Sequence, residues 1–237
     1  MELALLPPII LAIAEQRSLD AVLSSIATAV ASQSDVGLAR VWLRDTDRSC
    51  PVCAGHAPTN EEQTLHLRAS AGHPVDASSD WSRIDGAFHR IPLSAPLKIA
   101  HIARTAEPIR IDRLDRDDRW VKFPEWVRAE RMAGFAGRPL VFRGETLGVL
   151  GVFRRIELDD RCWEWLRMLA DTAAVAVKNA RALEEADSLR RALELERDYL
   201  REEVRHGGDS ARSLAEARHS SGSCVTSTPS QPPIPAC

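Results

Sequence analysis

The sequence lacks any long uncharged apolar stretch, and this excludes a simple membrane-spanning protein. No segment approaches the ~20 consecutive apolar residues that a transmembrane helix needs. Leu3–Ile13 is apolar, but it is short, contains Pro7 and Pro8, and follows Glu2 rather than a basic segment, which makes it a poor signal peptide. We therefore expect a cytoplasmic protein with no membrane partner.

The chain also has little cysteine and no excess of positive charge. Its 237 residues include 5 cysteines, which do not make a disulfide framework in a chain of this length. The 31 basic residues are balanced by 34 acidic ones, so nothing in the charge favours direct binding of nucleic acid. The Gly-x-x-x-x-Gly-Lys-Ser/Thr loop of phosphate-binding ATPases is absent as well. The remaining composition, 44% hydrophobic and 27% charged, is ordinary for a globular domain.

Composition divides the chain into segments. Residues 1–17 are predicted to form an N-terminal helix, and residues 18–182 a domain of mixed helices and strands. Residues 158–205 contain neither Gly nor Pro and are dense in Ala, Leu, Glu and Arg, which predicts a long helix from about Leu158. Residues 206–237 are rich in Ser, Gly and Pro and are predicted to be a disordered tail.

Hydrophobic periodicity predicts the elements of the middle segment. Apolar residues three and four apart predict a helix over 18–31 with Ser18 at its N-cap, and further helices are predicted over 98–104 and 124–132. Strands are predicted over 38–44, 64–70, 108–111, 135–142 and 146–153, and near 91–93. The turn at 143–145 joins the last two long strands as a hairpin. Gly148 and Gly151 within the second of them would allow another backbone or a ligand to approach closely.

This hairpin carries a family resemblance. Residues 137–140 read Gly-Arg-Pro-Leu and residues 144–150 read Gly-Glu-Thr-Leu-Gly-Val-Leu, and both resemble the paired strands of the GAF domain family. The order of the other elements agrees over roughly residues 15–182. The resemblance implies an α+β fold: a GAF/PAS-like antiparallel sheet of about six strands with flanking helices, followed by a long signalling helix. It also implies a sensor that binds a small molecule.

Two further segments narrow the resemblance. Residues 81–86 (Trp-Ser-Arg-Ile-Asp-Gly) and 195–204 (Leu-Glu-Arg-Asp-Tyr-Leu-Arg-Glu-Glu-Val) resemble the N-terminal sensory domains of sigma-54-dependent transcriptional activators. In that family an ATPase and a DNA-binding helix-turn-helix follow, and neither follows here. We therefore expect a truncated or frame-shifted relative, with a role in signal transduction and transcription regulation.

The resemblance also implies which residues line the ligand site. Aromatic side chains would form the walls, and a few polar groups would anchor the ligand. The candidate set is Trp81, Arg83, Phe88, His101, Trp120, Trp126, Phe135 and Arg138. The alternative is that the tryptophans only pack a lid against the sheet. The sequence identifies neither the ligand nor a cofactor.

The sequence can be compared with what several known ligands of the family require. The Asn-Lys-x-Phe-Asp-Glu pattern of cyclic-nucleotide binders is absent, and Cys162 lies too late in the chain for a bilin attachment site. A non-haem iron site would require pocket carboxylates, for which Asp85, Asp112 and Asp115 are available by type.

Cys50 and Cys53 have the spacing of a metal-binding pair. Two thiolates separated by two residues can hold zinc or an iron–sulfur cluster, with His56 and His66 as possible further ligands. The alternatives are two reduced surface thiols or a redox-labile pair. A metal site would make the protein a metal sensor and a redox-labile pair would make it a redox sensor.

A heptad spacing on the last helix predicts a parallel coiled-coil homodimer over residues 183–205. Ala186, Leu193 and Leu200 recur every seven residues, and Leu189 lies on the neighbouring seam. The alternatives are a solvated helix that frays and, at the level of function, a ligand-free dimerisation module.

Enzyme activity is not expected. Some stand-alone GAF proteins reduce methionine sulfoxide with cysteines in the pocket, but residues 71–142 contain no cysteine. A sensor kinase would need a phosphoacceptor helix, and His206 is followed instead by Gly207 and Gly208.

Overall fold

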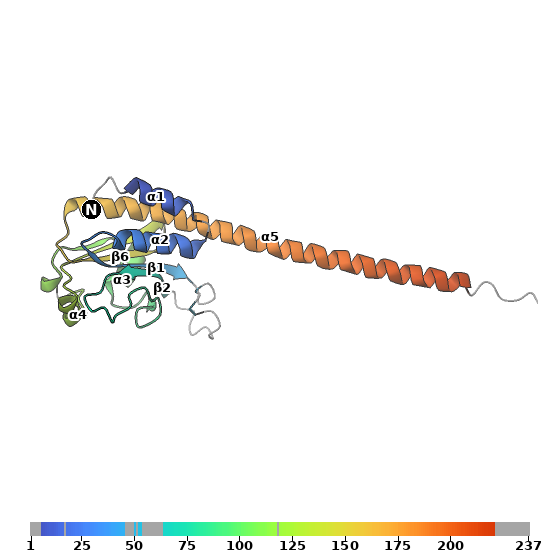
Figure 1. Cartoon of the computed structure of the whole chain (residues 1–237), viewed down its shortest axis with the longest axis horizontal. Helices are drawn as coiled ribbons and strands as arrows, with labels where there is room; N and C mark the ends of the chain where they lie inside the picture. The colour runs from blue at the N-terminus through green and yellow to red at the C-terminus, as the bar shows by residue number, and fades with distance from the viewer. Residues whose placement is uncertain are drawn as a thin grey trace, which may run out of the picture. The chain divides into compact units, whose positions relative to one another are not determined.

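The computed structural model describes residues 6–16, 18–45, 50, 52–53, 64–117 and 119–220. A six-stranded antiparallel sheet, in the order β3-β2-β1-β6-β5-β4, forms its centre (Figure 1). The strands are β1 (Val36–Asp45), β2 (Thr64–Gly72), β3 (Arg90–Pro92), β4 (Ile109–Ile111), β5 (Gly134–Phe142) and β6 (Glu145–Arg154). The predicted α+β class and strand number are confirmed, and β5 and β6 form the predicted hairpin.

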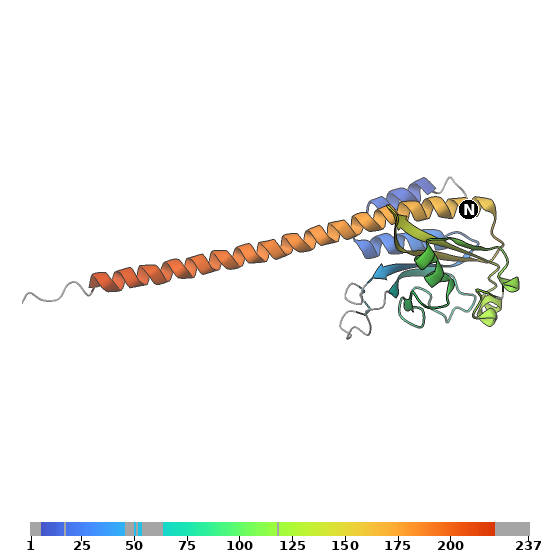
Figure 2. The same cartoon turned by 180° about the vertical axis from the view of Figure 1, so that it is seen from behind.

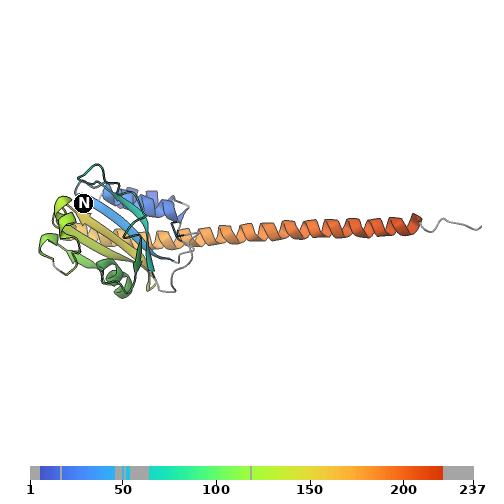
Figure 3. The ribbon, with the colours of Figure 1, turned by 90° about the horizontal axis from the view of Figure 1, so that it is seen from below.

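Helices cover both faces of the sheet. One face carries α1 (Leu6–Ala14), α2 (Leu19–Ala31) and the first part of α5 (Asp160–Ser220), and these pack side by side over the strands (Figures 1 and 2). The other face carries α3 (Lys98–Thr105), the short 3₁₀ helix η2 (Leu114–Arg116) and α4 (Pro124–Ala129), together with long connecting loops (Figure 3).

Strand β1 shows how the sequence separates the two layers. Because successive side chains of a strand point to opposite faces, Val41 and Leu43 pack against the helices while Trp42 points to the loop-covered face. The helical layer is a hydrophobic core that includes Ile26 of α2 and Trp165 of α5, both fully buried. The opposite layer is aromatic and is not completely filled.

Polar contacts tie α2 and α5 to the sheet at one end. The Ser18 side chain caps α2 by accepting a hydrogen bond from the Ala21 N–H at 3.3 Å, as predicted. The Glu184 carboxylate of α5 accepts a second one from the Leu19 N–H at 2.7 Å. Below them, the buried Arg68 of β2 pairs with Asp45, whose other oxygen is 2.7 Å from Arg181 of α5.

The two glycines of β6 allow close approaches from different neighbours. A Cβ atom at Gly148 would collide with the Trp42 carbonyl oxygen of β1, so the strand backbones come together here as expected. At Gly151, a Cβ atom would lie 3.1 Å from the Trp42 ring and 3.3 Å from Ile99 of α3. Glycine therefore leaves the space into which α3 and the Trp42 ring pack.

The chain divides into two compact units, Met1–Glu185 and Ala186–Cys237. Helix α5 begins close to the predicted position but continues to Ser220, beyond the predicted helix end at 205 and through Gly207 and Gly208. The reason lies in residues 211–218, where Ala, Leu, Glu and Arg favour helix enough to offset two glycines. The rest of the predicted tail, residues 221–237, lies outside the described residues. None of the described helices combines the length and apolar character needed to cross a bilayer.

Candidate functional site

A cavity of about 440 Å³ lies between the sheet and its loop-covered face. Its floor comes from β1 and β6, and its walls come from the segment before β3, the start of α3, and the segment from η2 through α4. The lining residues are Leu38, Arg40, Trp42, Trp81, Ala87, Phe88, Ile91, Leu97, Lys98, Ile99, Trp120, Val121, Lys122, Phe123, Trp126, Val127 and Phe153. We refer to it as the aromatic cavity.

Aromatic rings organise the cavity walls. The Trp126 ring of α4 packs edge-to-face on Phe153 of β6, with 5.2 Å between centroids, and lies 5.9 Å from the Trp81 ring. The Trp42 indole donates a hydrogen bond of 3.0 Å to the Phe88 carbonyl, so its polar end is satisfied and its apolar face is left to the cavity. An aromatic, preformed cavity of this size is typical of a small-molecule site.

Lys98 is one of the cations of the cavity. It begins α3, and its ammonium group lies 4.8 Å and 5.3 Å from the centroids of Phe135 and Phe153. It donates a hydrogen bond of 3.1 Å to the Trp120 carbonyl. Burial lowers the pKa of Lys98 to about 8, and the more distant Asp117 opposes this shift.

Arg40 supplies a second cation on the floor. Its Nε donates to the Ser70 hydroxyl at 3.2 Å, and burial lowers the pKa of the guanidinium. In the described part of the chain, no carboxylate lies within ion-pair distance of Arg40 or Lys98. The described lining residues include three cations, with Lys122 at the exposed rim, and no acidic side chain. Charge of a single sign in an apolar cavity favours an anionic ligand.

The structure brings four of the predicted ligand residues together. Trp81, Phe88, Trp120 and Trp126 all line the aromatic cavity. Phe135 is fully buried beneath it and contacts Phe153 at a centroid distance of 4.9 Å.

The predicted polar anchors lie elsewhere. Arg83 is exposed and forms an ion pair with Asp85. His101 packs its ring 5.3 Å from Trp120 and lies 4.0 Å from Glu107, outside the lining. Arg138 stacks at 3.5 Å over the Trp163 ring of α5, on the helical side of the sheet. None of these three side chains lines the described cavity, so the site proposed below does not include them.

The carboxylates considered for iron are also outside the cavity. Asp85, Asp112 and Asp115 are each exposed and pair with a nearby arginine two residues earlier in the chain. None of them lines the described cavity.

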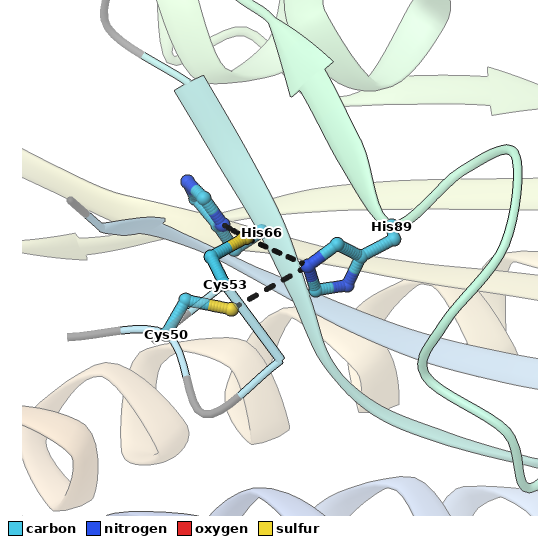
Figure 4. Close-up of side chains that lie close together, drawn as sticks. All are labelled: Cys50, Cys53, His66 and His89. Carbon is cyan, nitrogen blue, oxygen red and sulfur yellow. Dashed lines mark hydrogen bonds between the residues drawn. The ribbon is translucent and has the colours of Figure 1, made fainter. Parts of the chain in front are cut away.

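A second group of functional side chains lies beside the cavity. Cys50, Cys53, His66 and His89 bring one potential ligand atom each to within 4.8 Å of one another (Figure 4). The sequence indicated three of them, while His56, the other histidine named, lies outside the described residues. His89 was missed because no local spacing connects it with the cysteines; only the pairing of β3 with β2 brings it beside His66.

Comparisons with known proteins agree with this fold. A family model described as the GAF domain matches residues 18–177. Similar solved structures include the GAF domain of a phosphoenolpyruvate-protein phosphotransferase from Acinetobacter, which is 19% identical with a TM-score of 0.54 over 77% of this chain and 96% of that one. The corresponding domain from Coxiella burnetii is 18% identical with a TM-score of 0.55, over 76% of this chain and 94% of that one.

Another similar structure is an enzyme, the free methionine-R-sulfoxide reductase from Neisseria meningitidis. It is 17% identical with a TM-score of 0.54, over 75% of this chain and 89% of that one. Identities this low establish a common fold and leave activity open. A search of curated proteins found no match by sequence.

Proposed function

Because the chain belongs to the GAF family of sensing and signalling domains, we propose that it binds a small aromatic or apolar anion in the aromatic cavity. Binding is read out through a dimer formed by α5, and the response regulates an output such as transcription. The observation that carries the proposal is the charge of the cavity lining. Arg40 and Lys98 are cationic, and none of the described lining residues is acidic.

The chemistry of the two inner cations supports an anionic group on the ligand. Each lies in the largely aromatic and aliphatic lining of the cavity, and burial lowers the pKa of both. A carboxylate or sulfonate beside either cation would offset the loss of hydration that lowers its pKa. The aromatic walls would pack against the apolar body of the same molecule.

Exposed leucines on α5 support the dimeric readout. Leu189, Leu193 and Leu200 are 61%, 64% and 51% exposed and recur at the spacing of a coiled-coil seam. A long exposed helix gains stability from packing such a face. A ligand would signal by favouring one arrangement of the helix pair over another. The resemblance to sensors of sigma-54-dependent activators supports transcription regulation as the output.

A fluorescent anion tests the proposal directly. We expect 1-anilinonaphthalene-8-sulfonate to bind the folded protein at one site, with its fluorescence enhanced and blue-shifted. Lys98→Met should weaken binding about 10- to 100-fold, since a hydrogen bond to a charged group contributes roughly 1.5–3 kcal/mol.

The matched control is Lys178→Met, which removes a cation on α5 that pairs with Glu145. It should bind the anion like the wild type. A competition panel of aryl carboxylates and their neutral amides then identifies the ligand class. Equal affinity for carboxylates and amides, or unchanged binding in Lys98→Met, would reject the anion site and favour a dimerisation module.

A further inference from the structure

We propose that Cys50, Cys53, His66 and His89 form a closed tetrahedral zinc site that ties the Cys50–Cys53 turn to β2 and to the residue before β3. This inference does not rest on the anion site, because the residues of the cluster do not line the aromatic cavity. The described cluster holds two sulfur and two imidazole donors, which is an established ligand set for structural zinc.

The distances between the donor atoms suit one small cation. The His89 Nε2 lies 3.5 Å from the Cys50 Sγ and 3.2 Å from the Cys53 Sγ, and the His66 Nδ1 lies 3.6 Å from the Cys53 Sγ. Tetrahedral zinc with ordinary bond lengths requires donor–donor separations of about 3.3–3.8 Å. The widest separation in the cluster stays within 4.8 Å, so small side-chain rotations complete the tetrahedron.

Each imidazole is oriented by a contact on its far nitrogen. The His89 Nδ1 lies 2.7 Å from the Ile84 carbonyl and must donate a proton to it, which leaves the Nε2 lone pair facing both sulfurs. The His66 Nε2 lies 2.9 Å from the Thr64 hydroxyl, and its Nδ1 faces Cys53. Metal-bound histidines are held in this way, with the second nitrogen bonded to an oxygen.

Charge and burial also favour a zinc ion over a site open to substrate. His66 and Cys50 are 0% and 1% exposed, and His89 is 8% exposed. Two thiolates and two neutral imidazoles balance a divalent cation, so the occupied site carries no net charge into this buried position. Four protein ligands leave no open coordination position, which assigns the ion a structural role.

The cysteine turn and the histidines come from distant parts of the chain. The Cys53 N–H donates to the Cys50 carbonyl at 3.1 Å, closing the turn that presents both sulfurs. His66 lies on β2, and the His89 carbonyl accepts a hydrogen bond of 2.7 Å from the Leu67 N–H of the same strand. Zinc would therefore bind three separate segments of the chain together: the cysteine turn, β2 and the residue before β3.

The first test measures metal in the wild-type full chain. Protein purified in a reducing buffer should contain one zinc ion per chain by inductively coupled plasma mass spectrometry. Metal-stripped protein titrated with Co²⁺ should show the visible absorption of a tetrahedral ion and a near-ultraviolet thiolate-to-cobalt band, with an endpoint at one equivalent. Added zinc should then remove both absorptions.

Variants identify the ligands. Cys50→Ser and His89→Asn should each lose the tetrahedral cobalt spectrum and bind zinc at least tenfold more weakly. The matched controls are Cys162→Ala, in the helical core, and His101→Asn, on α3, which should both retain the wild-type spectrum. Far-ultraviolet circular dichroism checks the fold of each variant, and the wild-type cobalt titration tests the site without any substitution.

Three outcomes would overturn the proposal. The first is stripped wild-type protein that binds Co²⁺ without tetrahedral or thiolate bands. The second is a protein whose mass, after purification under reducing conditions, shows a Cys50–Cys53 disulfide in place of metal. The third is a folded His89→Asn variant with unchanged zinc affinity. Lys98→Met should keep its zinc, so a failed anion site and a failed metal site give different results.

Discussion

Lys98 illustrates how one residue combines a structural cost with the binding role proposed for it. Its ammonium group is held by two aromatic faces and a carbonyl, with no carboxylate in ion-pair distance among the described residues. Burial lowers its pKa from 10.5 to about 8. In the unfolded chain the group binds its proton up to the higher value, so its contribution to folding stability becomes more favourable as pH rises from about 8 toward 10.5.

Anion binding should show the opposite dependence on pH. A bound anion favours the charged ammonium, so affinity for 1-anilinonaphthalene-8-sulfonate should be constant below pH 8 and fall up to about tenfold per pH unit above it. Fluorescence titrations from about pH 7 to 10 measure this, because Arg40 stays protonated throughout. Lys98→Met should lack the transition at pH 8. A wild-type affinity that stays flat across this range would separate Lys98 from binding.

Asp159 is a second residue whose role follows from one contact. Its carboxylate accepts a hydrogen bond of 2.6 Å from the Cys162 N–H and so caps the first turn of α5, and this bond lowers the pKa of Asp159. Asp159→Ala should reduce the free energy of unfolding by about 0.5–2 kcal/mol at neutral pH, measured by urea denaturation.

The pH dependence and an isosteric control distinguish the cap from a general effect of charge. Because the folded-state pKa of Asp159 is lowered, its stabilisation is present above its ordinary value and is lost as pH falls through the folded-state value. The difference between wild type and Asp159→Ala should therefore shrink in acid. Asp159→Asn retains a capping oxygen and should cost much less; an equal loss in both variants would contradict the capping role.

At the level of elements, the sequence predicted a helix or strand correctly where its pattern lies within a short stretch of the chain. The helix α2 and the hairpin of β5 and β6 were predicted almost to the residue, since alternation, a cap and a tight turn all lie within short windows. Four of the seven aromatic lining residues, Trp81, Phe88, Trp120 and Trp126, also lie in segments that the family resemblance had indicated.

The remaining features depend on contacts between distant residues. Arg40 reads as an ordinary polar position in a mostly apolar strand, and only the packing of α3 and α4 turns that face into a cavity. Arg138 is also an arginine and was a predicted ligand anchor, but its position on β5 directs it to Trp163 on the other face of the sheet. Phe135 faces the cavity side while Ala136 and Leu140 pack in the helical core, so alternation along β5 places Arg138 on the helical face as well.

The seam of α5 gives a prediction that belongs to the element itself. Leu193→Glu combined with Leu200→Glu places two charges on the proposed dimer seam and should give a monomer with a folded GAF domain. Analytical ultracentrifugation measures the mass, and circular dichroism checks the fold. The expectation fails if the sedimentation mass equals that of the wild type.

A matched variant separates seam position from added charge. Ser188→Glu with Leu195→Glu adds the same two negative charges at positions two residues after the seam, where Leu195 is already 73% exposed. This variant should sediment as the wild type does. Dissociation of both double variants would indicate nonspecific charge repulsion in place of a coiled coil.

On the scale of the whole GAF domain, the sheet separates a tightly packed helical core from the aromatic cavity. The two sides communicate through strands that carry side chains to both faces: Trp42 of β1 lines the cavity, while its neighbour Leu43 packs in the core with Trp165 of α5. A ligand that shifts β1 or β6 therefore changes the surface on which the first part of α5 rests. This continuity supports a signalling route through the sheet. Evidence for the route would be a ligand-dependent shift of α5 between two arrangements.

The metal cluster and the cavity meet at adjacent residues, and this gives the last prediction. His89 is a proposed zinc ligand, while Phe88 lines the cavity and its carbonyl accepts the hydrogen bond from Trp42. Zinc should hold Phe88 in its wall position, so stripping the metal should weaken binding of 1-anilinonaphthalene-8-sulfonate, by about fivefold or more if coupling is of the usual size.

Linkage requires the anion to tighten zinc binding by the same factor, which a chelator competition measures. In Lys98→Met, zinc affinity without the anion should equal that of the wild type, and the increase caused by the anion should be smaller. Identical anion affinity in stripped and zinc-loaded protein would mean that the metal supports the fold without acting on the cavity.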